Sequence, residues 1–493
     1  MVSTPPELLR AAVARLAPVL PLLHAMGEHF AGAGFELALV GGPVRDAFLG
    51  RTSPDLDLTT DARPDQIEAI VAEHADAMWD IGRAFGTIGL RVGAQQVEVT
   101  TYRSDVYDGT TRKPVVAFGS SLEGDLTRRD FTVNAMALRL PSLEFVDLHG
   151  GLDDLAARVL RTPVEPEVSF GDDPLRMMRA ARFVAQLGFS VDPSVRAAMT
   201  SLAGSLEIIS AERIRDEFTK TLLAPAPRDG LTLLVETGLA GIFLPELPAL
   251  QLEVDEHHRH KDVYEHSLRV LEQAIALESG ESGGLGGSDG SDGPGGPDLV
   301  LRLAALLHDI GKPATREFQP GGGVSFHHHE LVGSRMAKRR LSAMRFDKET
   351  VTAVARLVEL HLRFHGYGDG QWTDSAVRRY VTDAGPLLPR LHLLTRSDCT
   401  TRNVRKAARL ARTYDALEAR ISALLEAESL AAVRPELNGD QIGAALGIAP
   451  GPLVGRAYRF LLALRLDEGV LGEDEARSRL LAWWAEQPES SVP

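Results

Sequence analysis

The spacing of apolar residues changes near residue 151, and this change most limits how the 493-residue chain can fold. Upstream, the apolar run 36–42, the alternating segment 55–60 and the hairpin-like segment 87–103 predict strands of a small sheet. Downstream, the spacing is helical. Helices are predicted there over 172–188, 194–204, 210–223 and 228–240. Two further helices are predicted upstream, over 7–33 and 44–50. The expected fold is therefore a small α/β unit followed by an all-α remainder.

Composition narrows the class of protein. No apolar run reaches the roughly 20 residues that cross a bilayer, and the N-terminus lacks a signal-peptide core. The single cysteine, Cys399, excludes an internal disulfide framework and fits a reducing compartment. We therefore expect a cytoplasmic protein with no membrane association. The net charge of −15 is unusual for a protein that binds nucleic acid, but local basic patches decide such binding.

Two aspartates one residue apart follow a glycine turn in GGPVRDAFLGRTSPDLDLTT (41–60). On a strand, Asp55 and Asp57 point to the same face, where each raises the other's proton affinity unless a cation lies between them. Mg²⁺ suits such a pair because it binds carboxylates together with substrate phosphates. The alternative is a solvated turn without a ligand.

The residues around the pair favour the metal interpretation. The backbone N–H groups of Gly41 and Gly42 can approach a phosphate closely, and Arg45 in the first turn of the following helix can reach the same anion. Together with the carboxylates, they indicate metal-assisted attack on a nucleotide phosphate.

Two further motifs carry paired charges. In DLTRRDFTVNAMA (125–137), Arg128 and Arg129 supply positive charge, and we expect Asp130 and Asn134 to orient them. In GDDPLRMMRAARF (171–183), Asp172 or Asp173 is predicted to be the N-cap of a helix, with Pro174 at its first position.

Asp173, Arg176 and Arg179 are spaced by three residues, so they are expected to share one side of that helix. Such an edge offers acceptors and donors to the Watson–Crick face of a base. The alternative is a surface ladder of ion pairs along the helix.

Five motifs follow one another along the chain: GGPVRD, DLDLTT, RRDFTVNAMA, DLHGGLDDLAARVLR (147–161) and DDPLRMMRAARF. In this order they resemble the motifs of the class II tRNA nucleotidyltransferases, which include CCA-adding enzymes and bacterial poly(A) polymerases. The resemblance runs from about residue 20 to about 240. It implies transfer of CMP and AMP from CTP and ATP to the tRNA 3′ end with release of pyrophosphate. It also implies that no nucleic-acid template is used.

The same resemblance implies roles for individual residues. Asp55 and Asp57 would bind two Mg²⁺ ions, and Asp173 with Arg176 would pair with the incoming base. The remaining nucleotide contacts would come from Gly41, Gly42, Arg45, Arg129, Arg179 and Arg182. In the family, the motif of Asp173 and Arg176 usually begins with glutamate where this chain has Asp172. The side chain of Asp172 is shorter, so the role of that glutamate is not carried over to this residue.

The stretch 101–126 resembles the family's flexible loop, which takes part in the switch from C to A addition. It retains Arg103, Asp105 and Arg112, which disfavours an enzyme that adds only CC. The shared motifs leave A-only addition and poly(A) synthesis open as alternatives.

A second group of residues lies between about 255 and 400. Histidine and carboxylate ligands on several helices can build one metal site, although a single histidine is more often an ordinary surface or core residue. The histidines and aspartates of this stretch, taken in their order along the chain, resemble those of the HD phosphohydrolase domain, which binds divalent metal and cleaves phosphate esters. The resemblance assigns the core ligands to His266, His308, Asp309 and Asp398, and a further pair to His329 and His361. A hydrolase as the main activity is therefore a competing interpretation.

A basic stripe follows in TTRNVRKAARLAR (401–413). Helical spacing places on one side Arg402, Arg405, Lys406, Arg409 and Arg412. The stripe is either an RNA backbone contact or a solvated face. A non-enzymatic RNA-binding protein would keep this stripe and lose the carboxylates, which are present here.

The expected organisation is an α/β nucleotidyltransferase palm at 20–150 and a helical neck and RNA-binding body at 151–250. An HD domain follows at 251–400, with a flexible insert predicted in the Gly-rich stretch 279–297, and a helical C-terminal region covers 401–493. Mg²⁺ is the expected cofactor, with a second divalent metal in the HD domain. The expected partners are tRNA, CTP and ATP, and the sequence indicates no protein partner.

Overall fold

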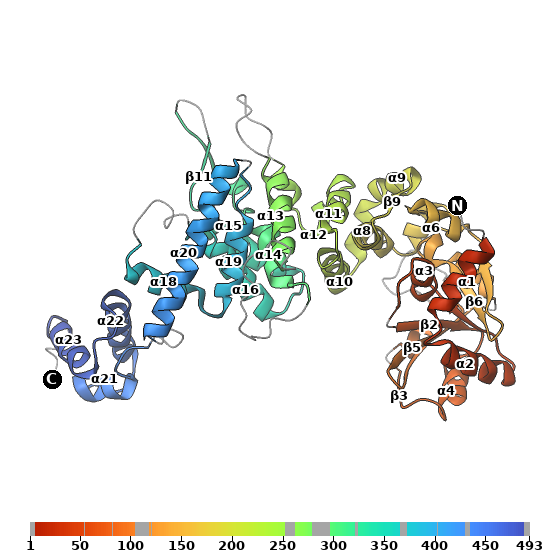
Figure 1. Ribbon diagram of the computed structural model, residues 1–493, viewed down its shortest axis with the longest axis horizontal. Coiled ribbons are helices and arrows are strands. Elements are labelled where there is room, and N and C mark those ends of the chain that lie inside the picture. Colours follow the sequence, from red (N-terminus) through yellow and green to blue (C-terminus); the bar gives the residue numbers. More distant parts are fainter. Residues whose placement is uncertain are drawn as a thin grey trace. The chain divides into compact units, whose positions relative to one another are not determined.

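The computed structural model of the chain confirms the predicted fold class (Figure 1). It describes residues 5–53, 55–80, 82–103, 118–119, 121–251, 262–278, 296–320, 324–364, 372–401, 403–428 and 434–487. The chain forms two compact units, Met1–Pro245 and Glu246–Pro493. This division falls near the predicted boundary at 250, and the finer domain boundaries remain predictions.

The first unit contains a seven-stranded sheet with the order β3-β4-β5-β2-β1-β6-β7. Its strands are β1 (Leu37–Val40), β2 (Asp55–Thr60), β3 (Ala77–Trp79), β4 (Thr87–Val92), β5 (Gln95–Thr101), β6 (Met136–Leu140) and β7 (Glu144–Asp147). The strands predicted at 36–42 and 55–60 and the hairpin at 87–103 are confirmed. Strand β2 runs parallel to β5, whereas the other pairs in the sheet are antiparallel.

The prediction of one helix over 7–33 is wrong. The chain forms α1 (Pro5–Arg15) and α2 (Leu20–Gly32), bent by 99° at the break. Pro18 lacks a backbone N–H and disfavours helical backbone at the preceding residue, so the first helix ends before it. Among the described residues no single helix is long and apolar enough to cross a membrane; this bent pair passes that test only when its two helices are counted together.

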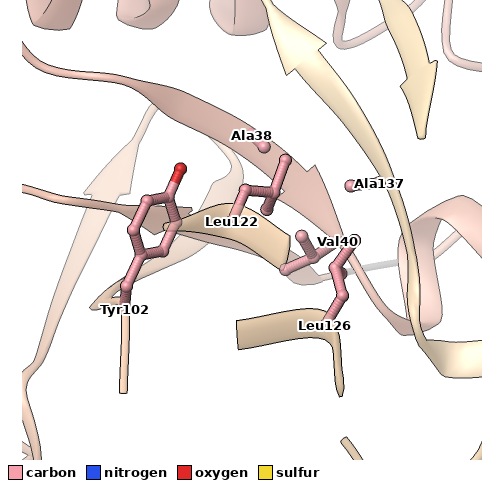
Figure 2. Close-up of a cluster of buried hydrophobic side chains, with 6 residues drawn as sticks. All are labelled: Ala38, Val40, Tyr102, Leu122, Leu126 and Ala137. Atoms are coloured by element: carbon pink, nitrogen blue, oxygen red, sulfur yellow. The ribbon is translucent and has the colours of Figure 1, made fainter. Parts of the chain in front are cut away.

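A buried cluster attaches α5 (Leu122–Thr127) to the sheet (Figure 2). Leu122 and Leu126 of this helix pack against side chains of β1 and β6 and against Tyr102, and all are almost fully buried. The Ser121 hydroxyl accepts a hydrogen bond from the Gly124 N–H and caps the helix. This packing fixes the position of α5, which carries Asp125 beside the arginines described below.

Helices follow the sheet in the first unit. They are α6 (Gly151–Ala157), α7 (Pro166–Asp172), α8 (Leu175–Leu187), α9 (Pro193–Ser201), α10 (Ala211–Leu222), α11 (Pro227–Glu236) and α12 (Ala240–Phe243). Four of them, α8 to α11, match the four stripes predicted downstream of residue 151. Helix α3 (Gly42–Phe48) matches the helix predicted at 44–50.

The second unit is mainly helical. Around the histidines it contains α13 (Val263–Glu278), α14 (Leu299–Leu307), α15 (His329–Ala343), α16 (Lys348–Leu360), α18 (Asp374–Ala384) and α19 (Leu388–Ser397), with the small hairpin β10 (Arg316–Phe318) and β11 (Val324–Phe326). Helix α20 (Val404–Glu428) precedes a bundle of α21 (Gly439–Leu446), α22 (Pro452–Glu468) and α23 (Glu473–Ala485). Most of the predicted flexible insert, 279–295, lies outside the described residues.

Candidate active site and histidine centre

The paired aspartates lie where the sequence predicts, on the open face of β2. Asp55 and Asp57 are exposed, whereas Leu56 between them is buried. The parallel neighbour β5 places Glu98 opposite Asp57, a third carboxylate that the sequence analysis missed. Its only sequence signal is the alternation in QQVEVTT, because the register between β2 and β5 depends on the folded sheet.

These carboxylates repel one another. Loss of hydration raises the pKa of Asp57, and Asp55 adds to this effect, while Arg129, Arg179 and Arg45 oppose it. Loss of hydration, together with Asp57 and Asp55, also raises the pKa of Glu98. Such a set of closely placed oxygen donors fits a hard divalent cation, which would relieve the repulsion.

The glycine turn brings the backbone close to this group. Gly41 has a φ of +73°, a backbone conformation that glycine adopts most easily. A Cβ at this position would lie 3.1 Å from the Arg129 Nη1 and 4.0 Å from the Asp57 Oδ2. A Cβ on Gly42 would lie 3.7 Å from the Arg45 Nη2. The turn, both arginines and Asp57 therefore surround one small space.

The partners of the arginines differ from those expected. Asp130 and Asn134 do not orient Arg128 and Arg129. Instead, the Arg45 Nη1 donates to the Asn134 Oδ1 at 2.7 Å, and the Arg179 Nε donates to the Asp130 Oδ2 at 2.7 Å. Although burial opposes ionisation, Arg179 and the Asn134 amide hold the pKa of Asp130 well below its usual range.

Asp125 orients Arg128 and Arg129 in their place. Its carboxylate is almost fully buried and pairs with Arg128 at 3.3 Å and with Arg129 at 3.0 Å. The three residues are spaced by three and four at the end of α5, which is the spacing of neighbours on a helix. This spacing was available in the sequence, but it was not used.

Three arginine side chains gather around Phe183 of α8: Arg179 and Arg182 come from the same helix, and Arg45 comes from α3. The guanidinium carbons of Arg45, Arg179 and Arg182 lie 5.3, 5.6 and 4.4 Å from the centre of its ring. Arg182 also pairs with Glu217 of α10 at 2.7 Å. Because like charges repel, the aromatic ring and the carboxylates are needed to hold the three arginines together.

Asp173 lies immediately before α8 rather than on it. The N-cap of α8 is Pro174, so the predicted cap at Asp172 or Asp173 is wrong, and Asp173 is the C-cap of α7. One Asp173 carboxylate oxygen nevertheless accepts from the Leu175 N–H at 3.1 Å, and the other pairs with Arg213 of α10 at 3.1 Å. Arg176 is buried, and it donates to the Ser169 backbone oxygen, the Ser169 hydroxyl and the Arg128 backbone oxygen. The pairing of Asp173 and Arg176 with a base stays a prediction, and Arg176 has few free donors left for it.

These contacts contradict the alternative of an ion-pair ladder along the helix. The charged groups of Asp173, Arg179 and Arg182 pair with other elements, not with each other. Arg213 and Glu217 are positioning residues that the sequence analysis missed. Nothing in their own segment, apart from a spacing of four on a predicted helix, connects them to the motif.

In the second unit, the structure brings together the six residues predicted as HD ligands. They form two groups, His266 with His308 and Asp398, and Asp309 with His329 and His361, and the ligand atoms of each group lie within 4.8 Å of one another. Asp309 connects the groups, since its carboxylate lies 3.2 Å from the His308 Nε2 and 3.3 Å from the His329 Nε2.

The histidines are oriented by their outer nitrogens. The Nδ1 atoms of His308, His329 and His361 lie 2.9, 2.8 and 2.7 Å from the backbone oxygens of Ala305, Phe326 and Val358. This contact leaves Nε2 pointing inward, which is the usual arrangement of metal-binding histidines. The Nε2 atom of His329 faces the Asp309 carboxylate, the Nε2 atom of His361 is buried without a hydrogen-bond partner, and burial lowers the pKa of His361 to about 4. The centre therefore fits two divalent metal ions.

The basic stripe is exposed on α20. Arg405, Lys406, Arg409 and Arg412 all face solvent at the N-terminal end of this helix. Arg402, predicted as part of the stripe, lies outside the described residues, as do Asp105 and Arg112 of the predicted loop. Arg103 is described and donates to the Thr87 hydroxyl at 3.0 Å.

Three domain families match the chain in order. They are the poly A polymerase head domain at 37–161, the probable RNA and SrmB-binding site of polymerase A at 188–250, and the HD domain at 263–403. The A-adding tRNA nucleotidyltransferase of Deinococcus radiodurans is 35% identical over 460 residues, which cover 92% of this chain and 96% of that enzyme. The chain belongs to the tRNA nucleotidyltransferase family.

Other relatives of this nucleotidyltransferase differ in how much of the two chains the match covers. The CC-adding tRNA nucleotidyltransferase of Thermus thermophilus is 32% identical and covers 90% of this chain and 93% of its own. The CCA-adding enzyme of Streptococcus gordonii is 42% identical, but the match covers 48% of this chain and 57% of that enzyme. The CCA-adding enzyme of Bacillus stearothermophilus in complex with CTP has the same fold, with a TM-score of 0.62 at 24% identity over 95% of this chain and 97% of that one.

Phe183→Leu tests the arginine cluster. Leucine stays apolar but loses the aromatic faces, so the three guanidinium groups are expected to separate and the KM for CTP and ATP to rise about tenfold. Steady-state kinetics on tRNA lacking its 3′ end measures this. Phe218→Leu removes another buried phenylalanine that packs against Phe243, and it is the matched control. Equal KM values in the two variants would contradict the role of Phe183.

Proposed function

We propose that this nucleotidyltransferase adds CMP and AMP from CTP and ATP to the 3′ end of tRNA, without a nucleic-acid template, and releases pyrophosphate. The observation that carries the proposal is the geometry at the glycine turn, where a Cβ on Gly41 would lie 3.1 Å from the Arg129 Nη1 and 4.0 Å from the Asp57 Oδ2. Carboxylates for a cation and arginines for a triphosphate thus converge beside a glycine turn. A tRNA substrate would place the enzyme in the cytoplasm.

The side chains divide the work of the reaction. Asp55 and Asp57, with Glu98 beside them, would hold Mg²⁺. When bound, Mg²⁺ would help ionise the RNA 3′-hydroxyl and neutralise the charge of the leaving pyrophosphate. Arg45, Arg129 and Arg179 would bind the triphosphate through charge-assisted hydrogen bonds. Asp173, fixed by Arg213, would offer its carboxylate to the incoming base.

The choice among the family's activities requires a direct assay. Two relatives that match most of this chain are an A-adding and a CC-adding enzyme, whereas the resemblance of 101–126 to the loop that switches from C to A supports addition of both nucleotides. Incubation of tRNA lacking CCA with labelled CTP, labelled ATP, or both tests the proposal. Incorporation of C followed by one A supports it, whereas ATP-only incorporation, above all with long tails, would favour an A-adding enzyme or a poly(A) polymerase.

The basic stripe of α20 is proposed to contact the RNA backbone. Reversing Arg405, Arg409 and Arg412 to glutamate is expected to weaken tRNA binding and to make its dependence on salt shallower, because fewer counterions are then released. Filter binding over a range of salt concentrations measures both effects. Reversal of Arg335, Lys338 and Arg339, exposed on α15, changes the net charge equally and serves as the control. An unchanged salt slope would refute the contact.

A second activity is favoured by the histidine centre. Two neighbouring groups of ligands with inward-facing histidine Nε2 atoms are suited to a two-metal hydrolase. We propose that the centre hydrolyses phosphate esters: water adds to phosphorus, the P–O ester bond breaks and an alcohol is released. Phosphatase and cyclic-phosphodiesterase assays with Ni²⁺ or Mn²⁺ test this activity, and no turnover with either metal would discard it.

A further inference from the structure

The hairpin formed by β10 and β11 lies in the sequence between the ligands His308–Asp309 and His329. Its register pairs Arg316 with Phe326 and Phe318 with Val324. Residues directly opposite each other, and residues two apart on one strand, share a face of the sheet. One side of the hairpin, called the hairpin face below, therefore consists of Arg316, Phe318, Val324 and Phe326.

The hairpin face is aromatic and cationic, and its Phe318 ring is open to solvent while the other three side chains are half-buried. Phe318 is 71% exposed, the highest value among the exposed large apolar side chains of the described second unit apart from Val404. The Arg316 guanidinium carbon lies 4.7 Å from the centre of the Phe318 ring. An exposed phenylalanine by itself requires no explanation. Here the exposed ring contacts a guanidinium group, and both lie on a hairpin that is flanked in the sequence by ligands of the histidine centre. This arrangement is more specific than an isolated exposed phenylalanine.

Two contacts connect the hairpin face to the histidine centre. The Phe326 backbone oxygen lies 2.8 Å from the His329 Nδ1, so β11 orients one of the six candidate ligands. The Lys312 Nζ lies 5.7 Å from the centre of the Phe326 ring and donates to the Asp309 Oδ2 at 2.6 Å. The cations and aromatic rings therefore continue from Phe318 through Phe326 and Lys312 to Asp309.

We propose that the hairpin face binds the end of a single-stranded RNA whose terminal phosphate ester lies at the histidine centre. Aromatic rings stack on bases of any sequence, and arginine or lysine side chains beside them bind the backbone phosphates. A small phosphate ester without a base would gain no stacking contact from the exposed Phe318 ring. This inference names the substrate class of the hydrolase activity proposed above and rests on that activity.

The first test compares two esters on the full-length protein with Mn²⁺ or Ni²⁺. One is a ten-nucleotide oligoadenylate with a 3′-phosphate, and the other is p-nitrophenyl phosphate, which has no nucleobase. In Phe318→Ala, the ratio of the kcat/KM values for the oligonucleotide and the aryl ester is expected to fall about tenfold, mainly through KM, as for the loss of one stacked base. Phe318→Trp is expected to restore the ratio. An unchanged ratio in Phe318→Ala would overturn the inference.

Matched variants and a cross-link separate this inference from the hydrolase proposal. Val470→Ala shortens a 62% exposed valine of the C-terminal bundle and is expected to keep the wild-type ratio. An oligonucleotide carrying 5-iodouridine next to its 3′ end is expected to cross-link to Phe318, as mapped by mass spectrometry. A cross-link without hydrolysis of either ester would discard the hydrolase and keep the RNA-binding face. No cross-link at Phe318 would overturn the inference, whatever the hydrolysis assays give.

Discussion

Replacing Asp57 with asparagine is expected to lower the rate of nucleotide addition at least about a hundredfold, because one ligand of the catalytic cation is lost while the fold is kept. Single-turnover incorporation of labelled CMP into tRNA lacking CCA measures the loss. Glu144→Gln makes the same chemical change on β7, at the far edge of the sheet, where the side chain is mostly exposed, and it is expected to stay within twofold of wild type. A fast Asp57→Asn variant would contradict the proposed site.

The same substitution is expected to leave the protein at least as stable as wild type when chelator removes metal. Loss of hydration raises the pKa of Asp57 in the folded protein, so the ionised carboxylate lowers stability at neutral pH. Asparagine removes this cost. The difference in the free energy of unfolding should begin to shrink once the pH falls below the raised pKa of Asp57 in the folded protein. It should vanish below the ordinary aspartate pKa of about 4, where the carboxyl group is neutral in the unfolded chain as well. A variant that is clearly less stable at pH 7 would show that Asp57 has a structural role instead.

Gly311→Ala is expected to disrupt the histidine centre. A Cβ at this position would lie 2.1 Å from the His329 backbone oxygen and 2.7 Å from the Gly333 backbone nitrogen, and neither is the flexible end of a side chain. The start of α15 must therefore move, which displaces His329 from Asp309. We expect a destabilisation of about 3 kcal/mol and loss of bound metal relative to wild type. Metal analysis of the purified protein and thermal unfolding measure the two effects.

A second glycine substitution controls for the added methyl group. Gly455 lies within α22, and a Cβ there would meet nothing within 4 Å. Gly455→Ala is therefore expected to be neutral or to stabilise the protein by about 0.5–1 kcal/mol, since alanine favours helix more than glycine does. If Gly311→Ala retained wild-type metal content and the wild-type melting temperature, the close approach of α15 would not matter for the centre.

The elements could be predicted where a local pattern decides them. The alternation in 55–60 and the two strands of 87–103 gave correct strands because one face of each is buried in the sheet. The helix over 7–33 failed because apolar spacing continues across Pro18, where the backbone cannot. A proline inside an amphipathic pattern was the stronger signal.

The site could be predicted as a set of residues but not as a set of pairs. Asp57, Arg45, Arg129 and Arg179 were all recognised, and the structure places them together. The pairing of Asp130 with Arg179 joins residues 49 positions apart, and no local spacing reports it. Asp125, four residues from Arg129, was within reach of the helical spacing rule.

The sequence by itself determined which side chains are candidates for the chemistry and which local structures present them, because motif order and hydrophobic spacing are properties of neighbouring residues. Only the tertiary structure decided which charges meet. It placed Glu98 beside Asp57 through strand pairing, bound Asp173 to Arg213 across two helices, and divided six distant ligands into two groups around Asp309. Electrostatic interactions act over a few ångströms in space, and the distance along the chain does not report that separation.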